Sequence, residues 1–169
     1  MSDDDRPCLF RKAEIEKMAE WRFVHQHNPD ALRFTRPLGD MAGCEDIGVH
    51  LVRVPPGSAS TCFHSHEVDE EFVYVISGRA VAEIGEETHE VGPGDVMVFA
   101  KNSPAHMMTN RSEDDFVFLV GGSRPDFDVC NYPRDGIRQF RVNGAREYTS
   151  PDQLKKVTAT SEKVDPPST

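Results

Sequence analysis

The sequence predicts an all-β protein folded as a sandwich or a barrel, and two observations support this prediction. Short apolar stretches rich in Val, Ile, Phe and Tyr recur about every 8–12 residues between residues 47 and 121. Turn signals such as Pro55-Pro56-Gly57 and Gly92-Pro93-Gly94 separate these stretches. Short strands at this spacing, punctuated by Gly and Pro, are typical of antiparallel sandwiches and barrels. No long helical period lies between them, which excludes a parallel sheet with crossover helices.

Each expected element follows from a local pattern. Residues 11–19 place Ile15, Met18 and Ala19 on one side of a helix, which predicts a short helical arm. The expected strands are residues 47–54, 60–66, 71–76, 80–84, 88–91, 96–99, 105–110 and 116–120.

The chain is expected to divide into four parts. Residues 1–40 form the N-terminal arm and residues 41–121 form the barrel. Residues 122–157 contain Pro125, Pro133 and Gly136, so we expect this segment to wrap back over the barrel. Within it, residues 126–138 should close one end of the barrel without forming a core strand. Residues 158–169 are polar and rich in proline, which predicts a disordered tail.

Composition narrows the classes of partner. The chain has 29 Asp and Glu against 19 Lys and Arg, a net charge of -10 that argues against nucleic acid and anionic membranes. Residues 41–120 carry 14 acidic and 4 basic side chains, so this segment would attract cations. The four cysteines form no CxxC pair, which argues against a cysteine-rich zinc site or a disulfide framework. We expect a cytoplasmic protein, because no secretory signal or membrane-spanning run is evident.

The most informative group of residues is His64, His66, Glu71 and His106. Side chains alternate along a strand, so His64 and His66 should point to one face, about 7 Å apart along the chain. Glu71 opens an apolar strand, where a charged residue needs a reason, whereas Glu70 should face the other way. His106 follows a turn and could supply a fourth ligand. This nitrogen and oxygen set suits Mn, Fe, Ni, Co, Cu or Zn and disfavours Ca and Mg.

The spacing of these residues resembles the first of two motifs of the cupin superfamily. That motif is a glycine, then HxH, then Glu and Gly. It reads here Gly57…His64-Ser65-His66…Glu71…Gly78, with one extra residue between Gly57 and His64.

The second cupin motif is a Gly/Pro turn followed by His, three residues and Asn. It reads here Pro93-Gly94…His106…Asn110, with Lys101 and Ser103 where a proline and a glycine usually precede the histidine. The resemblance covers about residues 47–121. It implies a double-stranded β-helix, the cupin jelly-roll barrel, and one divalent transition metal held by His64, His66, Glu71 and His106.

A narrower likeness follows the barrel. Residues 120–124 and 128–133 resemble single-domain cupins that are named as sugar-phosphate isomerases. Arg134 stands where those proteins often have an acidic residue after Tyr-Pro.

We expect a metal-dependent enzyme that acts on a small oxygenated metabolite, of the isomerase, lyase or dioxygenase type. Four protein ligands on a six-coordinate ion would leave two positions for water, O2 or a chelating substrate. Glu71 is the expected acid or base, since a ligand carboxylate can detach and accept a proton. The expected pocket residues are Cys62, Val73, Phe99, Met108, Phe118 and Tyr132, and the first five should make an apolar wall.

Alternatives remain open. A non-catalytic module that binds a small molecule or a metal could use the same barrel, and a purely structural barrel ranks third. Several arginines crowd the C-terminal segment and could bind an anionic substrate, although exposed pairs with the acidic barrel are favoured. These arginines are Arg124, Arg134, Arg138, Arg141 and Arg146.

Four other histidines are not expected to be ligands. His25 and His27 precede the turn at Asn28-Pro29 and are expected to be structural, while His50 and His89 should lie at the surface or at a strand edge. We also expect a homodimer, because isolated sandwiches leave edge strands that invite pairing. The N-terminal arm and residues 116–120 are the candidates to bury such an edge.

Overall fold

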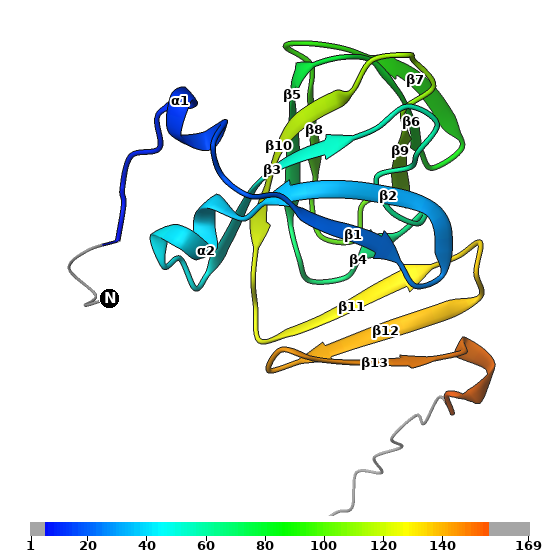
Figure 1. Cartoon of the computed structure of the whole chain (residues 1–169). Coiled ribbons are helices and arrows are strands. Elements are labelled where there is room, and N and C mark those ends of the chain that lie inside the picture. Colours follow the sequence, from blue (N-terminus) through cyan, green and yellow to red (C-terminus); the bar gives the residue numbers. More distant parts are fainter. Residues whose placement is uncertain (1–5, 156–169) are drawn as a thin grey trace, which may run out of the picture.

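This computed structural model describes residues 6–155, whose strands form three antiparallel sheets (Figure 1). The largest sheet has the strand order β1-β2-β3-β10-β5-β8, the second β13-β12-β11-β4 and the third β7-β6-β9. The strands are β1 (Trp21–His25), β2 (Asn28–Arg36), β3 (Ile47–Val54), β4 (Ser65–His66), β5 (Glu71–Ser77), β6 (Ala80–Ile84), β7 (Glu87–Val91), β8 (Val96–Phe99), β9 (His106–Thr109), β10 (Phe116–Ser123), β11 (Phe127–Tyr132), β12 (Ile137–Val142) and β13 (Ala145–Thr149). The helices are α1 (Lys12–Ile15), α2 (Leu38–Ala42) and a 3₁₀ helix at Pro151–Gln153. The predicted all-β class is confirmed.

The core lies between the six-stranded and the three-stranded sheets. Strands β3, β5, β8 and β10 bury alternate residues, as the period of a half-buried strand requires. Strands β6, β7 and β9 supply the opposite wall. The buried core residues are Val52, Val54, Val73, Val75, Ala80, Ala82, Val91, Met97, Phe99, Met108, Phe116 and Phe118.

Gly78 and Asn110, one residue from each cupin motif, stabilise the loops of this barrel. Gly78 has a φ of 78°, and a Cβ there would lie 2.2 Å from the carbonyl oxygen of Asp115, so only glycine fits this turn. Asn110 is fully buried, and its Nδ2 donates to the carbonyl oxygens of Val54 at 2.9 Å and Asp114 at 2.8 Å. Both residues hold the chain between β9 and β10 in place.

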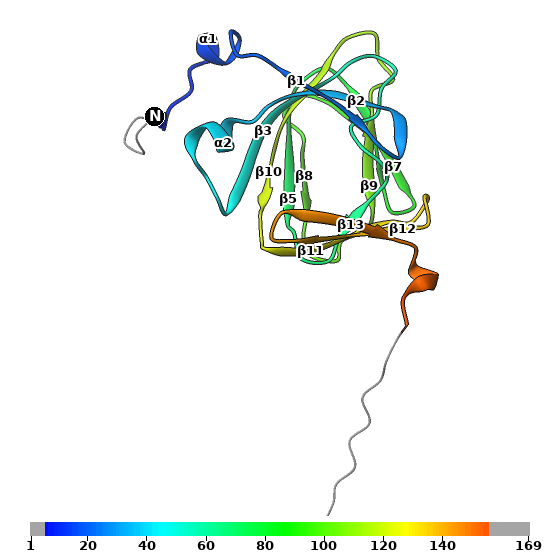
Figure 2. The ribbon, with the colours of Figure 1, turned by 60° about the horizontal axis from the view of Figure 1, so that its bottom comes forward.

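The C-terminal segment forms a sheet across one end of the barrel. Strand β11 pairs with β4, with Cys130 opposite His66, and β12 and β13 extend the sheet outward (Figure 2). The prediction that residues 126–138 form no core strand is wrong, because β11 buries Asp128, Val129, Cys130 and Tyr132. Pro133 and Gly136 lie in the turn between β11 and β12, so they bound strands instead of interrupting them.

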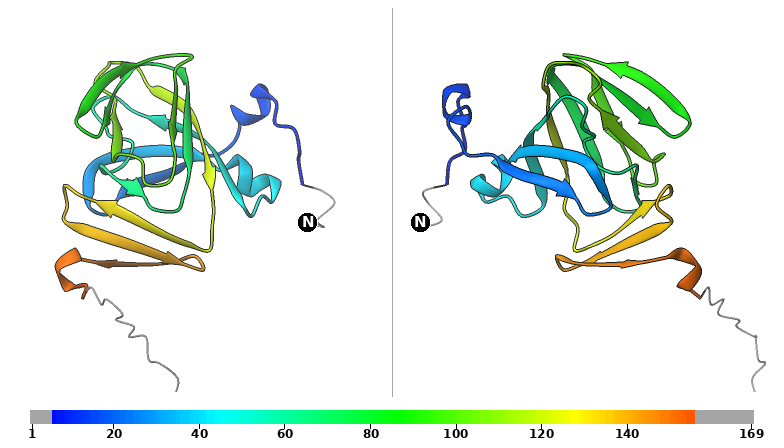
Figure 3. Two further views of the ribbon diagram at one scale, coloured as in Figure 1. Left: turned by 180° about the vertical axis from the view of Figure 1, so that it is seen from behind. Right: turned by 45° about the vertical axis from the view of Figure 1, so that its right-hand side comes forward.

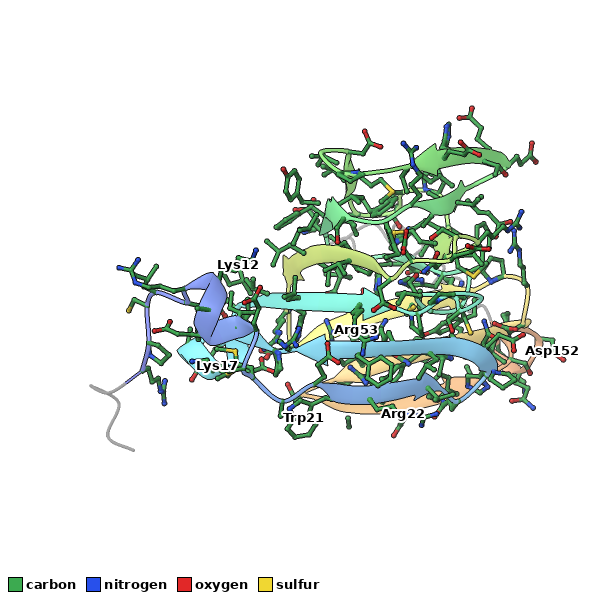
Figure 4. The ribbon with its side chains drawn as sticks, turned by 45° about the horizontal axis from the view of Figure 1, so that its top comes forward. Lys12, Lys17, Trp21, Arg22, Arg53 and Asp152 are labelled. Carbon is green, nitrogen blue, oxygen red and sulfur yellow. The ribbon has the colours of Figure 1, made fainter. Side chains whose placement is uncertain are left out.

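The N-terminal arm is mostly a β-hairpin. Strands β1 and β2 pair with each other, and β2 adds to β3, so the arm belongs to the largest sheet (Figure 3). The helix α1 is shorter than the predicted 11–19. Arg53 of β3 joins the arm to the barrel through an ion pair with Glu20 at 2.7 Å. Figure 4 shows Lys12 and Lys17 on the part of the arm that projects beyond the sheet.

Three further expectations need correction or placement. Of residues 60–64, His64 alone forms an isolated bridge, so the predicted strand is reduced to β4. Strand β10 lies inside the largest sheet, so residues 116–120 are not an edge. The predicted tail at 158–169 lies outside the described residues. Within residues 6–155, none of the helices has the length and apolar character needed to span a bilayer.

Candidate metal centre

The four predicted metal ligands come from neighbouring segments at the end of the barrel that β11 covers. His66 lies on β4, Glu71 opens β5 and His106 opens β9. His64 forms an antiparallel bridge with His106, since each backbone N–H donates to the other's carbonyl oxygen, at 3.1 and 2.7 Å. Backbone pairing therefore sets the relative positions of these two imidazoles.

Three of these residues converge on one point. The candidate ligand atoms of His64, Glu71 and His106 lie within 4.8 Å of one another. His66 lies beside them, with its ring centroid 4.9 Å from that of His64. Its ligand atom groups at this distance with those of His64 and Cys130, not with Glu71 and His106. Glu70 is exposed and belongs to none of the groups found within residues 6–155.

The hydrogen bonds of the three histidines determine which ring nitrogen is free. The Nδ1 atom of His64 lies 3.0 Å from the carbonyl oxygen of Cys62, and that of His106 lies 3.4 Å from the carbonyl oxygen of Pro104. The Nδ1 atom of His66 lies 2.6 Å from Oδ2 of Asp128. An oxygen of this kind only accepts, so each Nδ1 carries the proton and each neutral ring presents the Nε2 lone pair.

Burial keeps two of these imidazoles neutral. It lowers the pKa of His106 to about 4 and holds the pKa of His64 well below its ordinary value. The Nε2 atom of His106 is buried and has no hydrogen-bond partner within the described chain. Leaving such an atom unpaired is costly, and a metal ion would satisfy it. The residues present therefore fit a transition metal.

Asp128 orients His66. Its carboxylate accepts from His66 Nδ1 and from the backbone N–H groups of Val68 and Asp69, each at 3.1 Å. Burial by itself would raise the pKa of Asp128, but these donors lower it to about 2. Burial also disfavours the His66 cation, yet Asp128 outweighs this effect and raises the pKa of His66. A carboxylate behind a ligand histidine fixes its ring and increases its basicity.

A cavity of about 490 Å³ opens over His64, His66 and Glu71. Its wall is largely polar and carries several charged side chains, not apolar as predicted. Of the expected pocket residues, Tyr132 lines it, with its ring stacked 6.1 Å from that of His64. Val73, Phe99, Met108 and Phe118 belong to the core, and Cys62 packs with Cys130 and Tyr132. Strand parity directed these five side chains inward, and all five are buried, but none of them lines the cavity. Phe99 nevertheless lies against the site, because its ring stacks on that of His106 with centroids 3.5 Å apart.

Several lining residues were not predicted to belong to the site. They are His25, Arg33, Asp69, Asp128, Cys130, Arg141 and Arg146. A strand interpretation of residues 127–132 would have placed Asp128, Cys130 and Tyr132 on one face. Nothing in the local pattern around Arg33 indicates a site.

Of the other histidines, His50 differs from expectation. His25 is buried, its Nδ1 lies 3.2 Å from the Cys62 sulfur, and it lines the cavity without joining a ligand group found in residues 6–155, in agreement with the structural role expected for it. His50 is half-buried on an inner strand, contrary to the predicted surface position, and its Nε2 accepts from Arg124 at 3.1 Å. His89 is exposed beside Glu87, as expected.

A second cavity of about 560 Å³ adjoins the first. The residues that line both cavities are Arg33, Asp69, Glu71, Arg141 and Arg146. Glu71 therefore lies where the two spaces meet, and burial raises the pKa of its carboxyl group. A ligand in either cavity would reach the same carboxylate.

Comparison with known proteins gives consistent matches. A protein-family model described as a cupin domain matches residues 50–122. A protein of Acidithiobacillus ferrooxidans, provisionally named a sugar phosphate isomerase, is 34% identical with a TM-score of 0.86, covering 89% of this chain and 97% of that chain. A sugar phosphate isomerase of the cupin superfamily from Silicibacter pomeroyi is 26% identical with a TM-score of 0.75, covering 88% and 96%. A predicted oxalate decarboxylase of Thermotoga maritima, 18% identical with a TM-score of 0.55 and coverage of 66% and 96%, shares the fold. The search of curated proteins gave no match.

Proposed function

Because this chain belongs to the cupin superfamily, we propose that it is a metal-dependent enzyme that converts a small oxygenated metabolite at His64, His66, Glu71 and His106. One observation supports the metal above all: the donor atoms of His64, Glu71 and His106 converge, and the buried Nε2 of His106 has no hydrogen-bond partner in residues 6–155. The bound ion would be one divalent transition metal among Mn, Fe, Zn, Ni, Co and Cu.

The ion would supply Lewis acidity toward a substrate oxygen, or a template for O2 and substrate. The protein residues have separate tasks. His64 and His106 stay neutral because they are buried, so they can bind a metal over a wide pH range. Glu71 can hold or release a proton at its carboxylate, because burial brings its pKa upward toward the working pH.

Among the reaction types, we favour an isomerase. The relatives from Acidithiobacillus ferrooxidans and Silicibacter pomeroyi are both named for sugar phosphate isomerisation. Isomerisation of a hydroxy carbonyl compound needs a group that polarises the carbonyl and a base that moves a proton. A metal centre with a buried carboxylate beside it would meet both needs.

The test is metal analysis of protein purified without added metal. Wild-type protein should hold about one ion per chain, and His106→Ala should hold less than about a tenth of that, as expected for the loss of a ligand. His89→Ala is the matched control, since His89 is exposed on β7 and should leave the metal content unchanged. Circular dichroism should show that both variants are folded.

Activity is then tested with small keto acids, hydroxy acids and sugar phosphates. Turnover that is lost in Glu71→Gln at retained metal content would support the enzyme. Metal and ligand binding without turnover would favour the alternative, a non-catalytic binding module. Wild-type protein that binds no transition metal would refute the proposal.

A further inference from the structure

The charged residues of the metal-site cavity are equal in number but are not all paired with one another. Its wall carries three carboxylates, Asp69, Glu71 and Asp128, and three guanidinium groups, Arg33, Arg141 and Arg146. The ion pairs and hydrogen bonds within residues 6–155 show which of these six side chains have partners.

Two of the carboxylates have partners. Nη2 of Arg141 donates to both oxygens of Asp69, at 2.7 and 2.9 Å. Asp128 accepts from His66 at 2.6 Å. Glu71, the third carboxylate, belongs to the proposed metal centre and would be neutralised by the ion. Two guanidinium groups form no ion pair within residues 6–155, and they are Arg33 and Arg146.

Arg33 is held in place, and the acidic group that favours its charge is Glu71, with which it forms no ion pair in the described residues. Its Nη1 donates to the carbonyl oxygen of Ser60 at 2.9 Å, and its guanidinium lies 4.6 Å from the centroid of the Phe23 ring. No ion pair found in residues 6–155 includes it. A half-buried arginine with one hydrogen bond has most of its five N–H donors available. Burial lowers the pKa of Arg33, which shows the cost of a charge placed here.

Arg146 is an exposed residue that lines the same cavity. It lies on β13, opposite Arg141 on β12, and lines both cavities. The other C-terminal arginines pair with acidic side chains: Arg124 with Asp40, Arg134 with Glu83, Arg138 with Glu67 and Arg141 with Asp69. The Arg141–Asp69 pair lines the cavity, whereas exposed pairs were expected from the sequence. Arg146 has no such pair within the described residues. The charge of Arg146 disfavours the Arg33 cation, and both arginines disfavour the His25 cation.

We propose that Arg33 and Arg146 form an oxyanion subsite beside the metal centre, which holds a phosphate or carboxylate group of the substrate. Guanidinium groups suit both anions, because their parallel N–H donors match a pair of oxygens. The subsite adjoins Glu71, so an anion held there would place the adjoining carbon atoms next to the proposed acid or base. This inference deepens the proposed function. It rests on that function only in taking the bound anion to be part of the substrate.

The test is isothermal titration calorimetry of the full-length protein with inorganic phosphate and, separately, with acetate. The variant Arg146→Gln should weaken binding by about tenfold or more, as expected for loss of a charged hydrogen-bonding partner. Arg33→Lys keeps the charge but loses the planar fork, so it should also weaken binding. The anion that binds more tightly identifies the group as phosphate or carboxylate.

Arg134→Gln is the matched control. It removes the same charge from an exposed arginine of the same segment that pairs with Glu83 outside the cavity, and should change binding by less than about twofold. Each titration is repeated after EDTA treatment, and metal content is measured for every variant. Arginine-dependent binding without metal would support the subsite even if the metal proposal failed.

Two results would overturn the inference. One is binding of phosphate that disappears with EDTA but is unchanged in Arg146→Gln and Arg33→Lys, because the anion would then coordinate the metal alone. The other is the absence of measurable binding of either anion to folded wild-type protein. Normal metal content in that second case would leave the proposed metal centre intact.

Discussion

Replacing Asp128 by Asn should weaken both the fold and the metal centre. Asp128 is 2% exposed and accepts three hydrogen bonds, from His66, Val68 and Asp69. These donors overcome the burial that would raise its pKa, and bring it from 3.8 to about 2. A shift of about two units corresponds to about 2–3 kcal/mol of unfolding free energy, which Asp128→Asn would remove.

The directions of the pKa shifts of Asp128 and His66 on folding determine the pH at which stability should be measured. The pKa of Asp128 is lowered on folding, so its contribution is present above 3.8 and is lost as pH falls through about 2. The pKa of His66 is raised above 6.5, so its contribution is complete below 6.5 and is lost as pH rises through the higher folded value. The pair therefore stabilises the metal-free protein most between these limits, at about pH 5.5.

The assay is urea unfolding of EDTA-treated protein at about pH 5.5, followed by circular dichroism. The control is Asp126→Asn, which makes the same change at an exposed residue two positions earlier, for which the structure gives no side-chain hydrogen bond. Metal affinity of Asp128→Asn should also fall by about 10–100-fold. A loss of stability below about 0.5 kcal/mol, or one equal to that of the control, would refute the assigned role of Asp128.

Three other predictions concern the frame around the site. Asn110→Ala should lower the free energy of unfolding measured in urea by about 3–5 kcal/mol, because it removes buried hydrogen bonds and leaves carbonyl partners unpaired. An unchanged unfolding midpoint would contradict this. Gly78→Ala should cost more than Gly94→Ala, since both have a positive φ but only Gly78 would place a Cβ 2.2 Å from Asp115; equal costs would count against the steric argument. The homodimer stays a prediction, and light scattering at micromolar concentration should give twice the chain mass of 18.9 kDa, whereas the single-chain mass would refute it.

Local sequence patterns were sufficient to predict the fold class and most strand positions of the barrel. Strand alternation and Gly/Pro turns are local patterns, so residues 47–54, 80–84 and 96–99 could be assigned from their neighbours alone. The same alternation favoured Glu71 over Glu70, and in the structure Glu71 groups with His64 and His106 while Glu70 is exposed. The metal-binding role of these residues stays a prediction.

The residues that surround the candidate ligands could be identified only from the tertiary structure. Asp128 lies 62 positions after His66 in the chain, and Arg33 and Arg146 come from opposite ends of the described region. No local period connects such residues, because their proximity depends on β2 joining the largest sheet and on β11 to β13 closing the barrel.

The alternation of residues along the strands also could not predict that the cavity wall is polar. Alternation correctly directed Val73 and Phe118 inward, but it gives no information on depth along the barrel axis. Those residues fill the core, where close packing leaves no space for a ligand. The cavity opens at the end of the barrel instead, where charged side chains of β2, β11, β12 and β13 meet the candidate ligands.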